Sequence, residues 1–198
     1  MATVESVCVY CGSSNQADPK YLRVAADLGR FLATRGCRIV YGGGSTGLMG
    51  ALADAALEAG GEVIGVIPDH FYVPELAHTG LTRLEVVPDM HTRKARMAQL
   101  ADAFIALPGG FGTWEELFEV LTWAQIGLHQ KPVGLLNAFG FYDRLLDFIR
   151  HAREQGFLYK DHEDLLLARP DPQSLWEALT AFRPKAFRKW LTQPASSS

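Results

Sequence analysis

The stretch RIVYGGGSTGLMGALADAALEAGGEVIGVIP (38–68) determines the fold that we predict for this chain. It begins with an apolar run (38–41), passes through a glycine cluster into a helix-forming segment (48–59), and ends in a second apolar run (62–67) closed by Pro68. Short, uninterrupted apolar runs on either side of a helix are typical of parallel strands covered by helices. The stretch is therefore predicted to be a strand–helix–strand unit of a parallel sheet.

The same alternation of apolar runs and helical periodicity continues along the whole chain. Strands are predicted over 7–10, 38–41, 62–67, 84–87, 103–107, 132–136 and 164–168. Helices are predicted over 19–34, 48–59, 90–101, 113–126, 142–155 and 172–182. We therefore predict an α/β fold with a single doubly wound, Rossmann-like parallel sheet and helices on both faces. It would form one domain over residues 1–190, followed by a flexible tail over 191–198.

Composition and charge exclude several classes of function. The 198 residues are 48% hydrophobic and carry a net charge of −3, which argues against a nucleic-acid-binding protein that neutralises many phosphates. The first residues do not show the pattern of a signal peptide, and no apolar run is long enough to cross a bilayer, so we expect a cytoplasmic protein that does not contact membranes. The odd number of cysteines, Cys8, Cys11 and Cys37, predicts free thiols. The Cys8–Cys11 pair lies on a strand and has no second pair, so we interpret it as structural rather than metal-binding.

The first glycine cluster, YGGGSTGLMG (41–50), falls at the end of the second predicted strand. Its backbone could approach a ligand closely, and the free amides of the following helix attract anions. Gly42, Gly44 and Gly47 also fit the dinucleotide fingerprint, although that motif normally follows the first strand. Asp69, after the third strand, keeps the dinucleotide hypothesis open. The alternative is a tight turn whose glycines serve helix–strand packing.

The second glycine cluster, PGGFGTWEE (108–116), follows the fifth predicted strand. Amides at the start of a helix, together with the Thr113 hydroxyl, can hold a phosphate group. The spacing of Thr113 and Glu116 equally fits a capping box, in which the two residues only satisfy backbone donors. Glu115 and Glu119 add negative charge, so a phosphate at this turn requires compensating cations.

Compensating cations are available in DMHTRKAR (89–96), which opens the helix after the fourth strand. A helix that follows a strand of a doubly wound sheet begins at the carboxyl end of that strand. Arg93 and Glu116 are therefore expected to share the ligand-binding edge of the sheet. A solvated basic face is the alternative, and it suits Arg96 better than Arg93. His91 is interpreted as a polar packing residue rather than as a catalytic acid.

Four segments together resemble the LONELY GUY family of cytokinin-activating phosphoribohydrolases, some of which carry the older label lysine decarboxylase. They are CGSS (11–14), GGGSTGLMG (42–50), MHTRK (90–94) and PGGFGTWEE (108–116). The resemblance implies hydrolysis of N6-substituted adenosine 5′-monophosphate, and of adenosine monophosphate as a further candidate, to the free base and ribose 5-phosphate. It also implies a homodimer and no metal or organic cofactor.

The resemblance also implies which residues form the site. Arg93 and Glu116 would be the catalytic pair, because a carboxylate beside the anomeric carbon stabilises the positive charge that develops on the sugar. The phosphate would bind to the amides of 109–113. The substrate-binding residues would be Ser13, Gly43, Gly44, Glu75, Met90, Lys94, Gly109, Gly110, Gly112, Thr113, Glu115 and Thr122.

Three other functions compete with this interpretation. A lysine decarboxylase would need pyridoxal phosphate on a lysine, and none of the six lysines has an obvious context for that cofactor. A non-catalytic carrier could bind a nucleotide or a larger pterin-like ligand on the same scaffold. An NAD-dependent enzyme is the third. The pairing of Arg93 with Glu116 favours the hydrolase over the carrier, and a binding titration with NAD would test the third.

Overall fold

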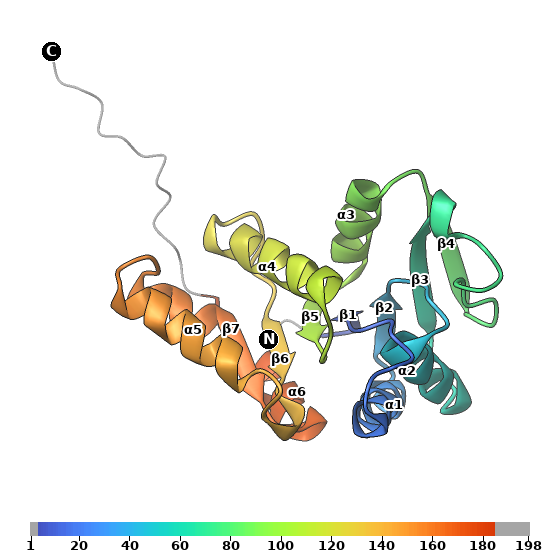
Figure 1. Cartoon of the computed structure of the whole chain (residues 1–198), viewed down its shortest axis with the longest axis horizontal. Coiled ribbons are helices and arrows are strands. Elements are labelled where there is room, and N and C mark those ends of the chain that lie inside the picture. The colour runs from blue at the N-terminus through green and yellow to red at the C-terminus, as the bar shows by residue number, and fades with distance from the viewer. Residues whose placement is uncertain (1–3, 185–198) are drawn as a thin grey trace, which may run out of the picture.

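The computed structural model describes residues 4–184, which form one seven-stranded parallel sheet with helices on both faces (Figure 1). The strands are β1 Ser6–Tyr10, β2 Arg38–Tyr41, β3 Val63–Pro68, β4 Arg83–Val87, β5 Ala103–Ala106, β6 Val133–Leu136 and β7 Leu166–Arg169. The helices are α1 Pro19–Ala33, α2 Gly47–Glu58, α3 Met90–Leu100, α4 Phe111–Gln125, α5 Asp143–Glu154 and α6 Pro172–Ala181. The predicted α/β fold is confirmed, and every predicted strand and helix is present.

The strands lie in the order β4-β3-β2-β1-β5-β6-β7. The chain starts in the middle of the sheet, extends to the β4 edge, and returns to the other side of β1 with β5. β1 and β5 pair in parallel, with Val7 opposite Ala103 and Tyr10 opposite Ala106. The strand order reverses between these two strands, and ligands of doubly wound sheets bind in the crevice at this switch point.

Two apolar cores hold the layers together. One core lies between the sheet and α1, α2 and α6, and the other lies between the sheet and α3, α4 and α5. All five residues of β1 are buried, which explains why this strand reads as an uninterrupted apolar run. The central strands are therefore covered on both faces, and the segments after them are the parts left to bind a ligand.

Helix ends differ in how their backbone donors are satisfied. The side chain of Asp18 accepts from the Lys20 amide at the start of α1, and the side chain of Asp89 accepts from the Thr92 amide at the start of α3. The first turn of α3, which carries Arg93, is therefore held by a side-chain cap. Neither α2 nor α4 has such a cap.

The predicted domain and its tail extend beyond the described residues. The predicted tail, 191–198, lies outside them, and the domain bounds 1–190 stay a prediction. No helix between residues 4 and 184 has both the length and the apolar character that a membrane span requires. Cys8, Cys11 and Cys37 are free and buried. In the same part of the chain, no group of three or more histidine, cysteine, aspartate or glutamate side chains could hold a metal ion.

Candidate active site

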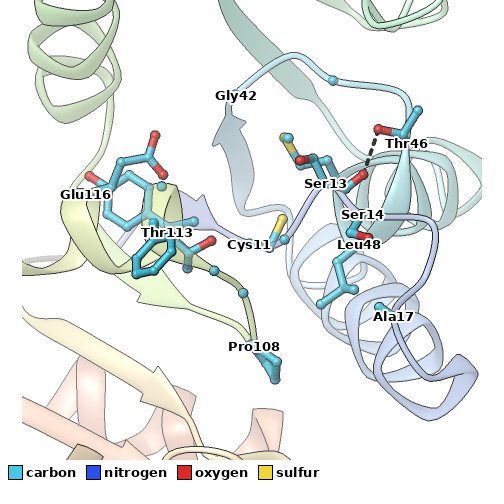
Figure 2. Close-up of a pocket in the computed structure, with 18 of the residues that line it drawn as sticks. Cys11, Ser13, Ser14, Ala17, Gly42, Thr46, Leu48, Pro108, Thr113 and Glu116 are labelled. Carbon is cyan, nitrogen blue, oxygen red and sulfur yellow. Dashed lines mark hydrogen bonds between the residues drawn. The ribbon is translucent and has the colours of Figure 1, made fainter.

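A cavity of about 740 Å³ opens at the carboxyl ends of the central strands, at the switch point between β1 and β5. The loop after β1, the first glycine cluster and the second glycine cluster all contribute to its wall. Figure 2 shows Thr113 and Glu116 on one side of the cavity, facing Ser13 and Thr46 on the other. The Thr46 hydroxyl donates to the Ser13 carbonyl oxygen (2.9 Å), which ties the two loops on that side together.

A buried ion pair joins α3 to α4 at the edge of this cavity. Nη1 of Arg93 donates to Oε1 of Glu116 at 2.9 Å, and Nε of Arg93 donates to the Val66 carbonyl oxygen of β3 at 3.0 Å. Arg93 is 9% exposed and Glu116 is 8% exposed, and both line the cavity. Two directed bonds hold the guanidinium, so the structure brings together residues 23 positions apart in the chain.

The surroundings of the Glu116 carboxylate shift its pKa in opposite directions. Burial raises its pKa above the ordinary value, and the nearby Glu115 carboxylate raises it further. The guanidinium of Arg93 and the ammonium of Lys94 act in the opposite direction without cancelling the effect of burial. A carboxylate of this kind is poorly solvated, so it interacts strongly with any positive charge that develops beside it.

A second cluster of charges lies directly behind the first. The Lys94 side chain is 8% exposed, and its Nζ donates to Glu115 and, at 3.0 Å, to Glu119. Burial lowers the pKa of Lys94, but the bonds to the two carboxylates outweigh this and raise it overall. Lys94 is therefore a permanent cation that is directed at α4 and not at the cavity.

The start of α4 is an uncapped helix N-terminus that faces the cavity. The helix begins after Gly110, and within residues 4–184 the amides of Phe111, Gly112 and Thr113 donate to no acceptor. Apart from the glycine itself, its two chain neighbours and the nearby backbone of α4, no atom of the described chain lies within 4 Å of where a Cβ would stand on Gly110 or Gly112. Free amides at a helix start attract anions. The capping-box alternative is wrong, because Thr113 lies inside the helix and Glu116 bonds to Arg93.

At the start of α2, two backbone amides already donate to acceptors from the loop after β1. The Gly47 amide donates to Oδ1 of Asn15, and the Leu48 amide donates to the Gly12 carbonyl oxygen, both at 2.9 Å. Gly47 has φ +59°, and a Cβ there would stand 2.5 Å from the Ser13 carbonyl carbon. The dinucleotide hypothesis expects these amides to be available to a pyrophosphate, and two of them are not. The packing alternative describes this turn better.

The first glycine cluster also makes room for the ion pair. A Cβ on Gly42 would stand 2.1 Å from Nη2 of Arg93. The bare backbone at this position therefore lets the guanidinium lie flat against the end of β2. Sequence reasoning missed this role, because nothing in the spacing of the glycines indicates which side chain approaches them.

The structure brings most of the predicted site residues to the cavity. Besides Arg93 and Glu116, the cavity wall includes Ser13, Gly44, Met90, Gly109, Gly110, Gly112, Thr113 and Glu115. Four predicted residues do not line it: Gly43, Glu75, Lys94 and Thr122. Gly43 turns toward Ile67 and Leu84, the Thr122 hydroxyl bonds to the Phe118 carbonyl oxygen, and Glu75 is exposed in the loop after β3. Their substrate contacts stay predictions.

Sequence reasoning also missed the two ends of the cavity. One end is apolar, with Met49, Ile67, Pro68, Phe71 and Leu76 beside Met90. The loop that carries Leu76 is held there by an antiparallel bridge between Gly44 and Ala77. The other end has Tyr21 and Phe141, whose rings meet edge to face at 5.5 Å. Two residues of this apolar end belong to motifs visible in the sequence: Met90, which was a predicted substrate-binding residue, and Met49 of the first glycine cluster.

Known proteins resemble this chain in both sequence and fold. The family described as possible lysine decarboxylases matches residues 49–179. A cytokinin riboside 5′-monophosphate phosphoribohydrolase from Rhodococcoides fascians is 56% identical over 157 residues, which are 79% of this chain and 79% of that protein. An enzyme of the same name from Arabidopsis thaliana is 47% identical over 178 residues, 90% of this chain and 83% of that protein.

A solved structure shows the same fold in a more distant protein. The molybdenum cofactor binding protein from Rippkaea orientalis superposes with a TM-score of 0.69, covering 91% of this chain and 98% of its own, at 23% identity. That similarity concerns the fold alone. The sequence relatives are much closer, cover most of both chains, and confirm the resemblance seen in the four motifs. The chain therefore belongs to the LONELY GUY family, whose matched members are named cytokinin riboside 5′-monophosphate phosphoribohydrolases.

Proposed function

We propose that the protein hydrolyses the N-glycosidic bond of an N6-substituted adenosine 5′-monophosphate, a cytokinin nucleotide, to the free base and ribose 5-phosphate. Adenosine monophosphate is a further candidate substrate. The observation that carries this proposal is the buried Arg93–Glu116 pair beside the uncapped start of α4. A carboxylate next to a free anion-binding helix end suits a substrate with a phosphate on one side and a developing cation a short distance away.

The geometry suggests how such a nucleotide would lie in the cavity. The 5′-phosphate would accept hydrogen bonds from the amides at the start of α4. Glu116 is three residues beyond Thr113, roughly one helical turn further along, so the ribose would reach the carboxylate while the phosphate stays on the amides. The base would then extend to the apolar end, between Met49 and Met90 and toward Leu76. That end suits a planar purine with an apolar N6 substituent.

Each step of the proposed hydrolysis has a residue assigned to it. The bond between the anomeric carbon and N9 breaks, its electron pair stays with the base, and the sugar becomes oxocarbenium-like by analogy with O-glycosides. Glu116 would stabilise that cation and orient a water whose oxygen bonds to the anomeric carbon. One proton of the water would be transferred to the departing base. Arg93 would hold Glu116 in place and favour negative charge on the base as it leaves.

The proposed chemistry uses only water and the nucleotide, so the expectation of no metal and no organic cofactor stands as part of the proposal. We further propose a homodimer. Support for it comes from large apolar side chains left exposed on α4 and just after it: Phe118 is 40%, Ile126 62% and Leu128 68% exposed. A cytoplasmic location would suit three free, buried thiols. Light scattering coupled to gel filtration tests the dimer.

A product assay tests the function. The purified protein is incubated with isopentenyladenosine 5′-monophosphate, adenosine monophosphate and adenosine, and free base and ribose 5-phosphate are separated by chromatography. We expect multiple turnovers with a nucleotide and a much slower reaction with adenosine, since adenosine lacks the group that the α4 amides would bind. Saturable nucleotide binding without product would instead support a carrier. Equal rates with adenosine and its monophosphate would refute the phosphate site.

A further inference from the structure

Lys94 is a buried cation that lies next to the proposed catalytic pair but does not reach the cavity. It follows Arg93 on α3, and both of its ion pairs are made with α4, through Glu115 and Glu119. To contact a nucleotide, its Nζ would have to leave two carboxylates and turn away from the position in which it is buried. The structure therefore calls for a different explanation of this side chain.

The charges between α3 and α4 form one compact group. Three carboxylates of α4, from Glu115, Glu116 and Glu119, face two cations of α3, Arg93 and Lys94. From β1 and the residue directly after it, three groups lie within electrostatic reach of Glu116: Cys8, Tyr10 and Cys11. Burial raises the pKa of all three, so they are uncharged near neutral pH. The group thus carries one net negative charge, and without Lys94 it would carry two.

We propose that Lys94 is a positioning residue: its ion pairs to Glu115 and Glu119 fix α4 against α3 in the alignment that joins Arg93 to Glu116. Lys94 occupies the face of α3 beside that of Arg93, so the two cations clamp successive acidic positions of α4. The same cation also draws the Glu115 carboxylate toward itself, although Glu115 borders the proposed phosphate site. It thereby reduces the repulsion that Glu115 would exert on an anionic substrate.

Lys94 has a second effect that follows from its charge. Its ammonium lowers the pKa of Glu116, against the effect of burial. Removing the ammonium would raise that pKa further, so the carboxylate form would be lost at a higher pH. Where activity is the readout, this part of the inference rests on the proposed function. The ionisation of Glu116 can also be followed without turnover, and that measurement does not depend on the proposed function.

Four variants separate the positioning role from a substrate contact. Lys94→Met removes the charge and keeps a side chain of similar length. Glu119→Gln and the double variant Lys94→Met/Glu119→Gln test whether the lost charge of Lys94 causes the effects of Lys94→Met. In the double variant, this group of side chains has the same net charge as in the wild type. Arg96→Gln is the matched control, because Arg96 lies on the same helix but pairs with Glu85 (2.7 Å), away from this cluster. Thermal unfolding of each variant reports on folding.

For Lys94→Met we expect kcat to fall roughly tenfold or more while KM changes less than about threefold, because small misalignment affects the reacting geometry most. When kcat is measured against pH, the fall of kcat on the acid side should move to higher pH by about 1 pH unit or more, as expected for losing a neighbouring opposite charge. In the double variant this fall should move most of the way back, while kcat recovers only in part because the clamp is still missing. Arg96→Gln should match the wild type.

Carbon-13 NMR of glutamate-labelled protein, with the Glu116 signal assigned by Glu116→Gln, measures the same ionisation directly. If the wild type hydrolyses no nucleotide, the proposed function fails, but the titration midpoints still test whether the Lys94 charge acts on Glu116. If Lys94→Met does not fold, the double variant is compared with Glu119→Gln instead. The proposal is overturned if Lys94→Met raises KM at unchanged kcat, or if removing Lys94 leaves both the midpoint and kcat unchanged.

Discussion

Replacing Glu116 by glutamine tests the proposed chemistry with a minimal change of shape. The amide oxygen of a glutamine can still accept the bond from Nη1 of Arg93, which in the wild type is 2.9 Å long. The bond from Nε of Arg93 to the Val66 carbonyl oxygen is not touched. The substitution therefore removes a charge and leaves the surrounding contacts in place.

The expected loss of rate follows from the position of that charge. Glu116 is 8% exposed and borders the cavity, so the surroundings screen its interaction with a developing cation only weakly. Losing one preorganised electrostatic group commonly costs on the order of 10²–10³ in kcat, or about 2.7–4 kcal/mol. We expect Glu116→Gln to lose at least that much activity with isopentenyladenosine 5′-monophosphate.

The stability of Glu116→Gln relative to the wild type is expected to depend on pH. Burial raises the pKa of Glu116 in the folded protein, even with Arg93 beside it. Folding therefore favours the protonated acid, and stability that is fully present below the unfolded pKa is lost as pH rises through the higher folded value. The neutral glutamine avoids this loss. The substitution also leaves the buried Arg93 guanidinium without its counter-charge, which opposes this gain at pH 7. The stability of Glu116→Gln relative to the wild type should fall as the pH is lowered from 7 toward 4.5.

Two measurements on the same samples examine this prediction. Chromatography of the released base gives kcat, and urea unfolding at several pH values gives the free energy of unfolding. Near-wild-type turnover would refute the role of the Glu116 carboxylate. A stability relative to the wild type that does not fall between pH 7 and 4.5 would refute the electrostatic account of Glu116.

Other substitutions address the remaining parts of the site. Arg93→Lys should recover little activity, because a single ammonium cannot replace the two directed bonds to Val66 and Glu116; kcat measures this. Gly42→Ala should lose on the order of 10²-fold in kcat, since its Cβ would stand 2.1 Å from Nη2 of Arg93 and a displacement of about 1 Å can cost that much. Gly110→Ala should unfold at the wild-type temperature, as its Cβ meets no atom within 4 Å, but its KM for the nucleotide should rise because the methyl group would stand where we place the phosphate.

The fold was predictable because its signals are local. β1 and β3 are buried along their whole length, and β2 is buried after Arg38. Glycine or proline stands at the end of each of these runs. The start of α4 was less predictable. The sequence favours Thr113 as the capping residue, since Thr113 and Glu116 have the spacing of a capping box, yet the helix begins after Gly110. A helix that leaves its first amides open for a ligand departs from the rule that predicts helix starts.

The site was predictable only to the level of the sheet edge. The rule that helices begin at the carboxyl ends of strands brings Arg93 and Glu116 to the same edge, and the structure joins them. That rule says nothing of side-chain direction. Arg93 lines the cavity, whereas the ion pairs of Lys94 with Glu115 and Glu119 direct its side chain to α4, and the order of the strands does not indicate this difference. The bridge between Gly44 and Ala77, which places the apolar end, joins residues 33 positions apart, and no local pattern indicates it.

The two glycine clusters show why such a motif cannot identify a ligand site by itself. Both follow a strand, both open a helix, and neither helix has a side-chain cap of its own. The difference lies elsewhere in the chain, because the loop after β1 supplies Asn15 and the Gly12 carbonyl oxygen to the amides of α2, and no described segment supplies the equivalent to α4. Unsatisfied amides destabilise a helix end, and an anion that accepts from them recovers that stability only when it is bound. The anion site therefore arises where the rest of the fold leaves backbone donors free, and only contacts between distant segments determine which of two similar motifs that is.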